Sequence, residues 1–189
     1  MLRDALRSVT ALLLLTVLCG AVYPLVVWGV GRSAFADRAG GSLVRADGRV
    51  VGSALLGQEF TSDRYFHGRP SAVGYAADAA GSGGSNLGPN SRELSRTVAR
   101  RRAEVAARDG VDPAAVPVDL VTASASGLDP DISEAAALIQ VARVARARGV
   151  PASAVRALVL ARVHGPVLGL LGARHVRVLE LNLALDRLP

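Results

Sequence analysis

The stretch SVTALLLLTVLCGAVYPLVVWGVG, residues 8–31, decides how this chain is organised. It contains no charged side chain, and it exceeds the roughly 20 apolar residues that a helix needs to cross about 30 Å of hydrocarbon. It therefore predicts one transmembrane helix, with residues 1–7 as a short tail and residues 32–189 on the other side of the membrane. Within the span, Gly20 and Gly29 are positions where a neighbouring helix can approach closely.

The orientation of the span follows from its flanks, which carry similar numbers of basic residues. Arg3 and Arg7 precede the span, and Arg32 and Arg38 follow it. Because the short tail is the easier end to keep in the cytoplasm, we expect a cytoplasmic N-terminus and an extracytoplasmic domain at the plasma membrane.

A cleaved secretory signal is the competing interpretation of the same stretch. Residues 34–36, Ala-Phe-Ala, have the small-x-small pattern that signal peptidases prefer, which would start a mature chain at Asp37. However, the apolar core of a signal peptide has about 7 to 15 residues, and this run is longer. We therefore favour a retained anchor.

Composition limits what the outer part can be. Residues 32–189 suffice for one domain with a single core. The single cysteine, Cys19, lies inside the span, so the outer domain has no disulfide, thiolate metal site or cysteine nucleophile. The net charge of +6 comes from arginines without lysine. Because no aromatic residues alternate with them, we expect no binding to nucleic acid.

The first half of the outer domain predicts a hairpin, a long loop and a helix. Asp47-Gly48 separates two apolar runs, residues 42–45 and 50–56, as a two-residue hairpin turn does. Residues 58–90 are rich in Gly, Ser and Asn, and loops of this length are usually functional or disordered. A thin apolar stripe then predicts a surface helix that begins after Ser91 and ends at Gly110.

The second half predicts two more helices and a strand. Ser133 is a candidate N-cap for a buried helix that ends before Gly149. Ser153 is the candidate N-cap of the next helix, which we expect to end near His164. Residues 176–183 alternate between apolar and polar side chains, which indicates a half-buried strand. Together these elements predict an α+β domain.

Two strings carry side chains that a fold does not need: the first comprises residues 58–60, 65–72 and 83–89, and the second comprises residues 117–130. A hydrolase is one interpretation of them. Ser124 or Ser126 would be the nucleophile and His67 the base, oriented by Asp129 or Asp119. No Gly-x-Ser-x-Gly elbow surrounds either serine, and such residues more often hydrogen bond their own backbone in turns.

Phosphate and metal binding have weaker signals. The glycine-rich residues 81–86 lack the Gly-Lys-Ser/Thr ending of a phosphate-binding loop. His67, His164 and His175 do not have the spacing of metal ligands. We expect no metal bound by this chain.

Taken in order, these strings resemble the C subunit (KdpC) family of the high-affinity potassium-transporting P-type ATPase of bacteria and archaea. Asp131 departs from the pattern, since a histidine is common there, and so do residues 173–175. The matching strings follow a single N-terminal span and are residues 52–53, 57–58, 65–71, 83–89, 119–124, 126–130, 132–133, 140, 143–144 and 181–185.

The resemblance implies an accessory subunit without catalytic residues. In that family's complex, a channel-like A subunit carries potassium, a P-type B subunit hydrolyses ATP through an aspartyl phosphate, and a small F subunit stabilises the assembly. ATP, Mg²⁺ and K⁺ would be handled by those partners, and this chain would contact them and membrane lipid. The sequence agrees, because it lacks the Asp-Lys-Thr-Gly phosphorylation string.

The candidate site residues lie in the two strings and near the C-terminus. Aromatic and arginine side chains are favoured at interface centres, whereas the hydroxyl and amide side chains could hold the two strings together. Both a partner interface and an internal network therefore remain open for this set, which comprises Gln58, Tyr65, Phe66, His67, Arg69, Ser71, Ser85, Asn86, Thr122, Ser124, Ser126, Asp129 and Asn182.

Overall fold

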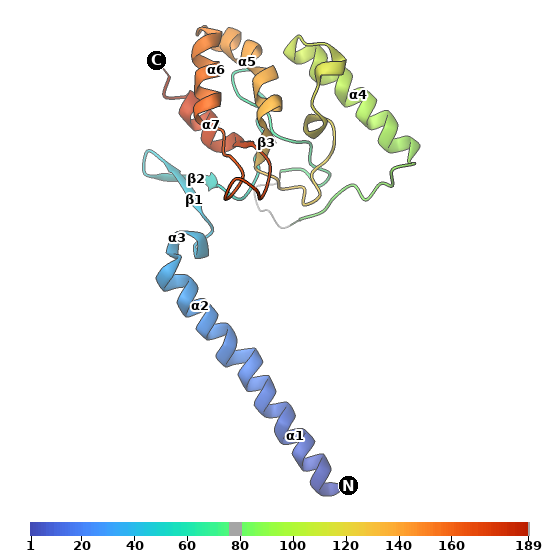
Figure 1. Ribbon diagram of the computed structural model, residues 1–189, viewed down its shortest axis with the longest axis vertical. Coiled ribbons are helices and arrows are strands. Elements are labelled where there is room, and N and C mark those ends of the chain that lie inside the picture. The colour runs from blue at the N-terminus through green and yellow to red at the C-terminus, as the bar shows by residue number, and fades with distance from the viewer. Residues whose placement is uncertain (76–80, 189) are drawn as a thin grey trace. The chain divides into compact units, whose positions relative to one another are not determined.

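The computed structural model describes residues 1–75 and 81–188. The chain divides into two compact units, Met1–Leu43 and Val44–Pro189, which we describe separately. Figure 1 shows a long helix in the first unit and a mixed domain in the second.

The first unit consists mainly of one continuous helix. It is composed of α1 (Leu2–Val17), a π-helical turn (Leu18–Val22) and α2 (Tyr23–Ala34), and the short helix α3 (Ala36–Ala39) follows. An 18-residue window of this helix has a mean hydropathy of 2.3, and none of it is buried within the structure. The helix extends beyond residues 8–31 at both ends, so the membrane boundaries within it remain a prediction.

The second unit begins with the predicted hairpin. Strands β1 (Leu43–Ala46) and β2 (Arg49–Ser53) pair with each other. Asp47 and Gly48 between them have φ angles of 50° and 78°. Two positive φ angles are what a type I′ turn requires, and Asp-Gly adopts them readily.

The core of the second unit is built by helices around a very short second sheet. The helices are α4 (Arg92–Asp109), α5 (Glu134–Arg148), α6 (Ala152–Ala161) and α7 (Val178–Leu185). Strands β3 (Asp131–Ser133) and β4 (His175–Arg177) pair antiparallel, with Ile132 opposite Val176. The α+β class is therefore confirmed. Fully buried side chains of the core include Phe66, Val121, Ile132, Val144, Val155, Val159, Val176, Leu181 and Leu185.

Helix ends follow local sequence signals in two cases. The hydroxyls of Ser91 and Ser133 accept hydrogen bonds from backbone N–H groups in the first turns of α4 and α5. Gly110 and Gly149 end these helices in the left-handed conformation. Both helices thus lie where the capping residues predicted them.

Two predicted elements differ from the structure. Ser153 does not cap α6, because Pro151 occupies the N-cap position, and the helix ends at Ala161, before His164. The predicted strand 176–183 is wrong beyond Arg177, where the chain turns into α7. Strand β3 has only three residues to pair with, while α7 buries Val178, Leu181 and Leu185 at helical spacing.

Candidate functional site

The first part of the long loop, residues 58–75, is held inside the domain by amide side chains from two helices. Asn182 of α7 accepts from the Phe66 N–H at 2.8 Å and donates to the Phe66 carbonyl at 3.0 Å. Gln140 of α5 binds His67 in the same way, at 2.8 Å and 3.1 Å. Consecutive residues of the loop are therefore clamped from opposite sides, as a strand would be by neighbouring strands.

A buried arginine extends this clamp. Arg143 of α5 donates to the Asp109 carboxylate at 2.6 Å, to the Tyr65 carbonyl at 3.0 Å and to the Gln140 side chain at 2.7 Å. It also donates to the Asp63 carbonyl. The side chains of Arg143 and Asp109 are 2% and 0% exposed, so both charges are satisfied inside the protein.

Sequence reasoning did not assign these roles to Gln140, Arg143 and Asp109. The available signal was a pair of polar residues, Gln140 and Arg143, three positions apart on an otherwise apolar stretch of helix. Buried polar groups need partners, so such a pair indicates an internal network.

The two strings meet at an ion pair between Arg69 and Asp129. The guanidinium lies 2.8 Å from the carboxylate, and both side chains are about a quarter exposed, at 25% and 27%. Tyr75, which sequence reasoning missed, donates its hydroxyl hydrogen to the Arg69 carbonyl. Burial, followed by the nearby Asp129 charge, raises the pKa of Tyr75 and keeps that proton in place.

Gly57 shows how closely the strings approach. Its N–H donates to the Leu128 carbonyl at 2.8 Å. A Cβ atom at this position would lie 2.5 Å from the Asp129 carbonyl oxygen and 2.6 Å from the Tyr75 ring. Only glycine fits this crossing without movement of the backbone.

The serines of the second string bind backbone. Ser124 receives a hydrogen bond from the Gly127 N–H at 3.0 Å, and Ser126 receives one from the Leu128 N–H at 3.1 Å. The two hydroxyls lie 3.1 Å apart. The Ser126 carbonyl accepts from the Gly83 N–H at 2.8 Å, which fixes the glycine-rich segment to the second string.

This arrangement does not assemble the hypothetical hydrolase. The ring of His67 contacts the Ser62 carbonyl at 3.1 Å, Asp119 accepts from Ser133, and Asp129 is paired with Arg69. Burial, then the nearby Arg108 charge, lowers the pKa of His67. In the described part of the chain, the hydrogen bonds of these groups lead to other partners and do not join a serine hydroxyl to the His67 imidazole.

The remaining candidates are distributed around the loop. Gln58 donates to the Val51 carbonyl of β2, and the Tyr65 hydroxyl donates to Asp186. Ser71 and Thr122 bond carbonyls of their own turns, those of Gly74 and Val118. Asn86 adopts a left-handed φ of 52°, and Ser85 lines a second pocket beside α4.

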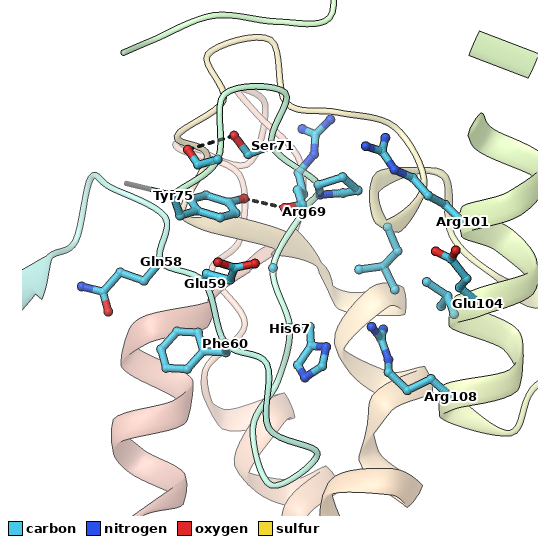
Figure 2. Close-up of a pocket in the computed structure, with 15 residues that line it drawn as sticks. Gln58, Glu59, Phe60, His67, Arg69, Ser71, Tyr75, Arg101, Glu104 and Arg108 are labelled. Carbon is cyan, nitrogen blue, oxygen red and sulfur yellow. Dashed lines mark hydrogen bonds between the residues drawn. The ribbon is translucent and has the colours of Figure 1, made fainter. Parts of the chain in front are cut away.

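A cleft of about 410 Å³ lies between this loop and α4. Figure 2 shows Tyr75, Glu59, Arg69 and His67 on the loop side, with Arg101, Glu104 and Arg108 projecting from α4. Its charges are mixed, so it suits a polar segment of a partner better than an apolar ligand. The described residues contain no group of three His, Cys, Asp or Glu side chains that could hold a metal ion.

The two glycines of the span are open. Apart from each glycine, its chain neighbours and the helix backbone within four residues, no described heavy atom lies within 4 Å of the position that a Cβ would take at Gly20 or at Gly29. Both positions are thus free for contact with another helix.

The fold and these sites define a class: a protein with one N-terminal helix that is long and apolar enough to cross a membrane, and an α+β domain whose long loop is clamped from within. The family described as "KdpC: K+-transporting ATPase, c chain" matches residues 5–187. The chain belongs to this family.

Relatives support the assignment over nearly the whole length. The "Potassium-transporting ATPase KdpC subunit" of Bradyrhizobium diazoefficiens is 52% identical over 200 residues, covering 99% of this chain and 98% of the relative. The subunits of the same name from Nitratidesulfovibrio vulgaris and Caulobacter vibrioides are each 54% identical, and they cover 95% and 98% of this chain. The alignments span 91% and 92% of those two relatives. The chain is thus a subunit of a potassium-transporting ATPase complex.

Proposed function

We propose that this chain is the accessory, non-catalytic subunit that stabilises the assembly of the channel-like and ATPase subunits of the potassium pump. The observation that carries the proposal is the family match over residues 5–187, which includes both the span and the domain. A single span cannot enclose an ion pathway, so the contribution of this chain comes through contact.

Each unit has a role in this proposal. The span packs against helices of the channel-like subunit, with Gly20 and Gly29 as points of close approach. The domain lies outside the cytoplasm and covers the mouth of that subunit, where it shapes ion access. The ATPase subunit, the small subunit and membrane lipid complete the surroundings.

ATP, Mg²⁺ and K⁺ are handled by the partners in this scheme, and this chain binds none of them directly. An extracytoplasmic domain does not meet cytoplasmic nucleotide, so any effect on ATP affinity travels through the subunits as a conformational bias. Protection of the full chain against thermal unfolding by ATP would contradict this.

The test is copurification. A C-terminally tagged chain, extracted in mild detergent, is expected to bring down a P-type ATPase and its channel-like partner, and potassium-stimulated ATPase activity is expected to vanish when the chain is deleted. Replacing the span by an unrelated apolar helix should weaken recovery of the partners. Recovery of the tagged chain alone would reject the proposal.

The cleft can be tested with matched variants of α4. Glu104 and Glu93 are both exposed carboxylates of this helix, but only Glu104 lines the cleft. If the cleft receives a partner segment, Glu104→Arg reduces recovery of the complex and Glu93→Arg does not. Equal recovery for the two variants would remove the cleft from the interface.

The alternative function, a membrane-tethered or secreted serine hydrolase, makes a different prediction. Ser126→Ala would abolish a hydrolase that uses Ser126 and His67. An accessory subunit would keep its partners and its ATPase activity after that change. A soluble mature chain that starts at Asp37 would also favour the hydrolase.

A further inference from the structure

An exposed apolar loop between α6 and β4 has no role in the function proposed so far. Residues 165–172, which we call the apolar tip, carry no charged side chain. Val167, Leu168, Leu170 and Leu171 are 65%, 88%, 86% and 66% exposed. Single exposed aliphatic residues are common, but four within five positions form a patch that marks an interaction site.

The apolar tip has a defined conformation. The backbones of His164 and His175 pair at its base, with N···O distances of 2.8 Å and 3.1 Å. Val167 and Leu171 pair in the same way nearer the end, at 2.8 Å and 3.0 Å. Leu168 and Gly169 between them have φ angles of 54° and 74°. A left-handed leucine is costly, so this turn presents its aliphatic side chains at some expense in free energy.

The base of the apolar tip is basic. Arg162 and Arg174 are exposed on either side of it, and His164 and His175 stack with their ring centroids 5.4 Å apart. Facing charges come from Glu134, which pairs with Arg174 at 2.6 Å, and from Asp131, 3.8 Å from His175. An apolar end with arginines behind it matches the order of hydrocarbon and phosphate in a lipid leaflet.

The chain also keeps its domain near a bilayer. Residues 35–42 separate the end of α2 from β1 and span at most about 28 Å when extended. A second contact with the same membrane is therefore intramolecular, and even weak insertion is effective at such a local concentration. Four side chains are too few for a stable protein interface alone, which buries about 800 Å² on each partner.

We propose that the apolar tip inserts into the interfacial region of the bilayer that holds the span, with Arg162 and Arg174 against anionic headgroups. The proposal requires that the span lies in a membrane, and it is independent of which subunits surround the span.

The test measures how close the apolar tip lies to lipid. Cys19→Ser removes the native thiol of the full chain, and Leu170→Cys then accepts an environment-sensitive fluorophore. Leu55→Cys is the matched control, because Leu55 is also an exposed leucine of the domain, at 56%. Both proteins are reconstituted into vesicles of phosphatidylethanolamine and phosphatidylglycerol, with and without lipids that carry a quencher in the acyl chain.

We expect a blue-shifted emission at position 170 and quenching several-fold stronger than at position 55. Equal quenching at the two positions would overturn the proposal. The same measurement in the assembled complex identifies the other occupant: a blue shift that lipid quenchers do not affect would place the apolar tip in an apolar pocket of a partner subunit, which also overturns the proposal.

The headgroup contact has its own pair of variants. Arg162→Gln is expected to reduce the gain in quenching that phosphatidylglycerol gives over neutral lipid. Arg156→Gln, at an exposed position of α6 farther along the chain from the apolar tip, is expected to leave that gain in quenching unchanged. An equal response of both variants would remove the contact between these arginines and lipid headgroups from the proposal.

Discussion

Arg143 is a charged side chain buried inside the domain, and it stabilises the fold through the groups that it hydrogen bonds. Replacement by methionine would leave the buried Asp109 carboxylate with Arg108 as its remaining arginine partner, 3.0 Å away. Removing one member of a buried pair typically costs about 3–5 kcal/mol, and the Arg108 contact places Arg143→Met near the lower end. Chemical unfolding of the full chain in detergent measures this loss.

The control for Arg143 is an arginine that the core does not use. Arg102 is exposed on α4. Arg102→Met is expected to change the free energy of unfolding by less than about 0.5 kcal/mol. Similar values for the two variants would show that the buried network contributes little.

Asp131 differs from Arg143, because its surroundings stabilise its negative charge poorly. Burial raises its pKa above the ordinary value of 3.8, while the charge of His175 offsets part of that rise. One carboxylate oxygen has no hydrogen-bond partner among the described residues. The raised pKa means that the folded state favours the protonated form of Asp131. The stability that this preference contributes is complete below the unfolded pKa and is lost as pH rises through the folded pKa.

Asp131→Asn is therefore expected to unfold at a higher temperature than the wild type at pH 7, because the amide cannot ionise. The advantage should shrink as the pH is lowered from 7 through the raised pKa of Asp131, below which the native carboxyl is protonated as well. Thermal unfolding of the full chain across this range measures the difference, with the exposed Glu93→Gln as control. A difference that does not vary with pH would contradict the argument.

Helices α5 and α7 act together on the loop, through the amides of Gln140 and Asn182. Gln140→Ala and Asn182→Ala each leave a backbone N–H and a carbonyl of the loop without a partner, which costs about 1–3 kcal/mol. Because the two amides hold consecutive residues, a substitution that frees the loop at one residue also weakens the contact at the next. The second substitution then removes less stabilising free energy than it would alone. We expect the double variant to be destabilised by less than the sum, as a double-mutant cycle measures. Additive losses would show that the amides act independently.

The helices also show which parts of the fold can be predicted from the sequence and which cannot. The ends of α4 and α5 were predictable, because Ser91, Ser133, Gly110 and Gly149 act through local hydrogen bonds and φ angles. Helix α7 was not, because its side chains alternate over a short run and the limiting factor is the three-residue partner strand β3. The strings were visible as polar residues in a glycine-rich context. Their clamps were not, because contacts between residues 66 and 182 depend on the tertiary fold.

For the whole molecule, the orientation of the span is the prediction on which the other roles depend. In a Cys19→Ser background, a cysteine at the exposed Ala107 is expected to react with a membrane-impermeant maleimide in intact cells. A cysteine at Arg3 is expected to react only after the membrane is permeabilised. The reverse pattern would place the domain in the cytoplasm, where nucleotide could reach it.

The positions of the two open glycines restrict how the span can be surrounded. Gly20 and Gly29 are nine residues apart, and at about 100° per residue of α-helix they lie on different sides of the helix, although the wider π-helical turn that contains Gly20 reduces the angle between them. A single straight neighbour can therefore approach one of them closely, but not both. If both are used, the span is an inner member of its helix bundle with a neighbour on each side, and loss of either neighbour would leave one side facing lipid.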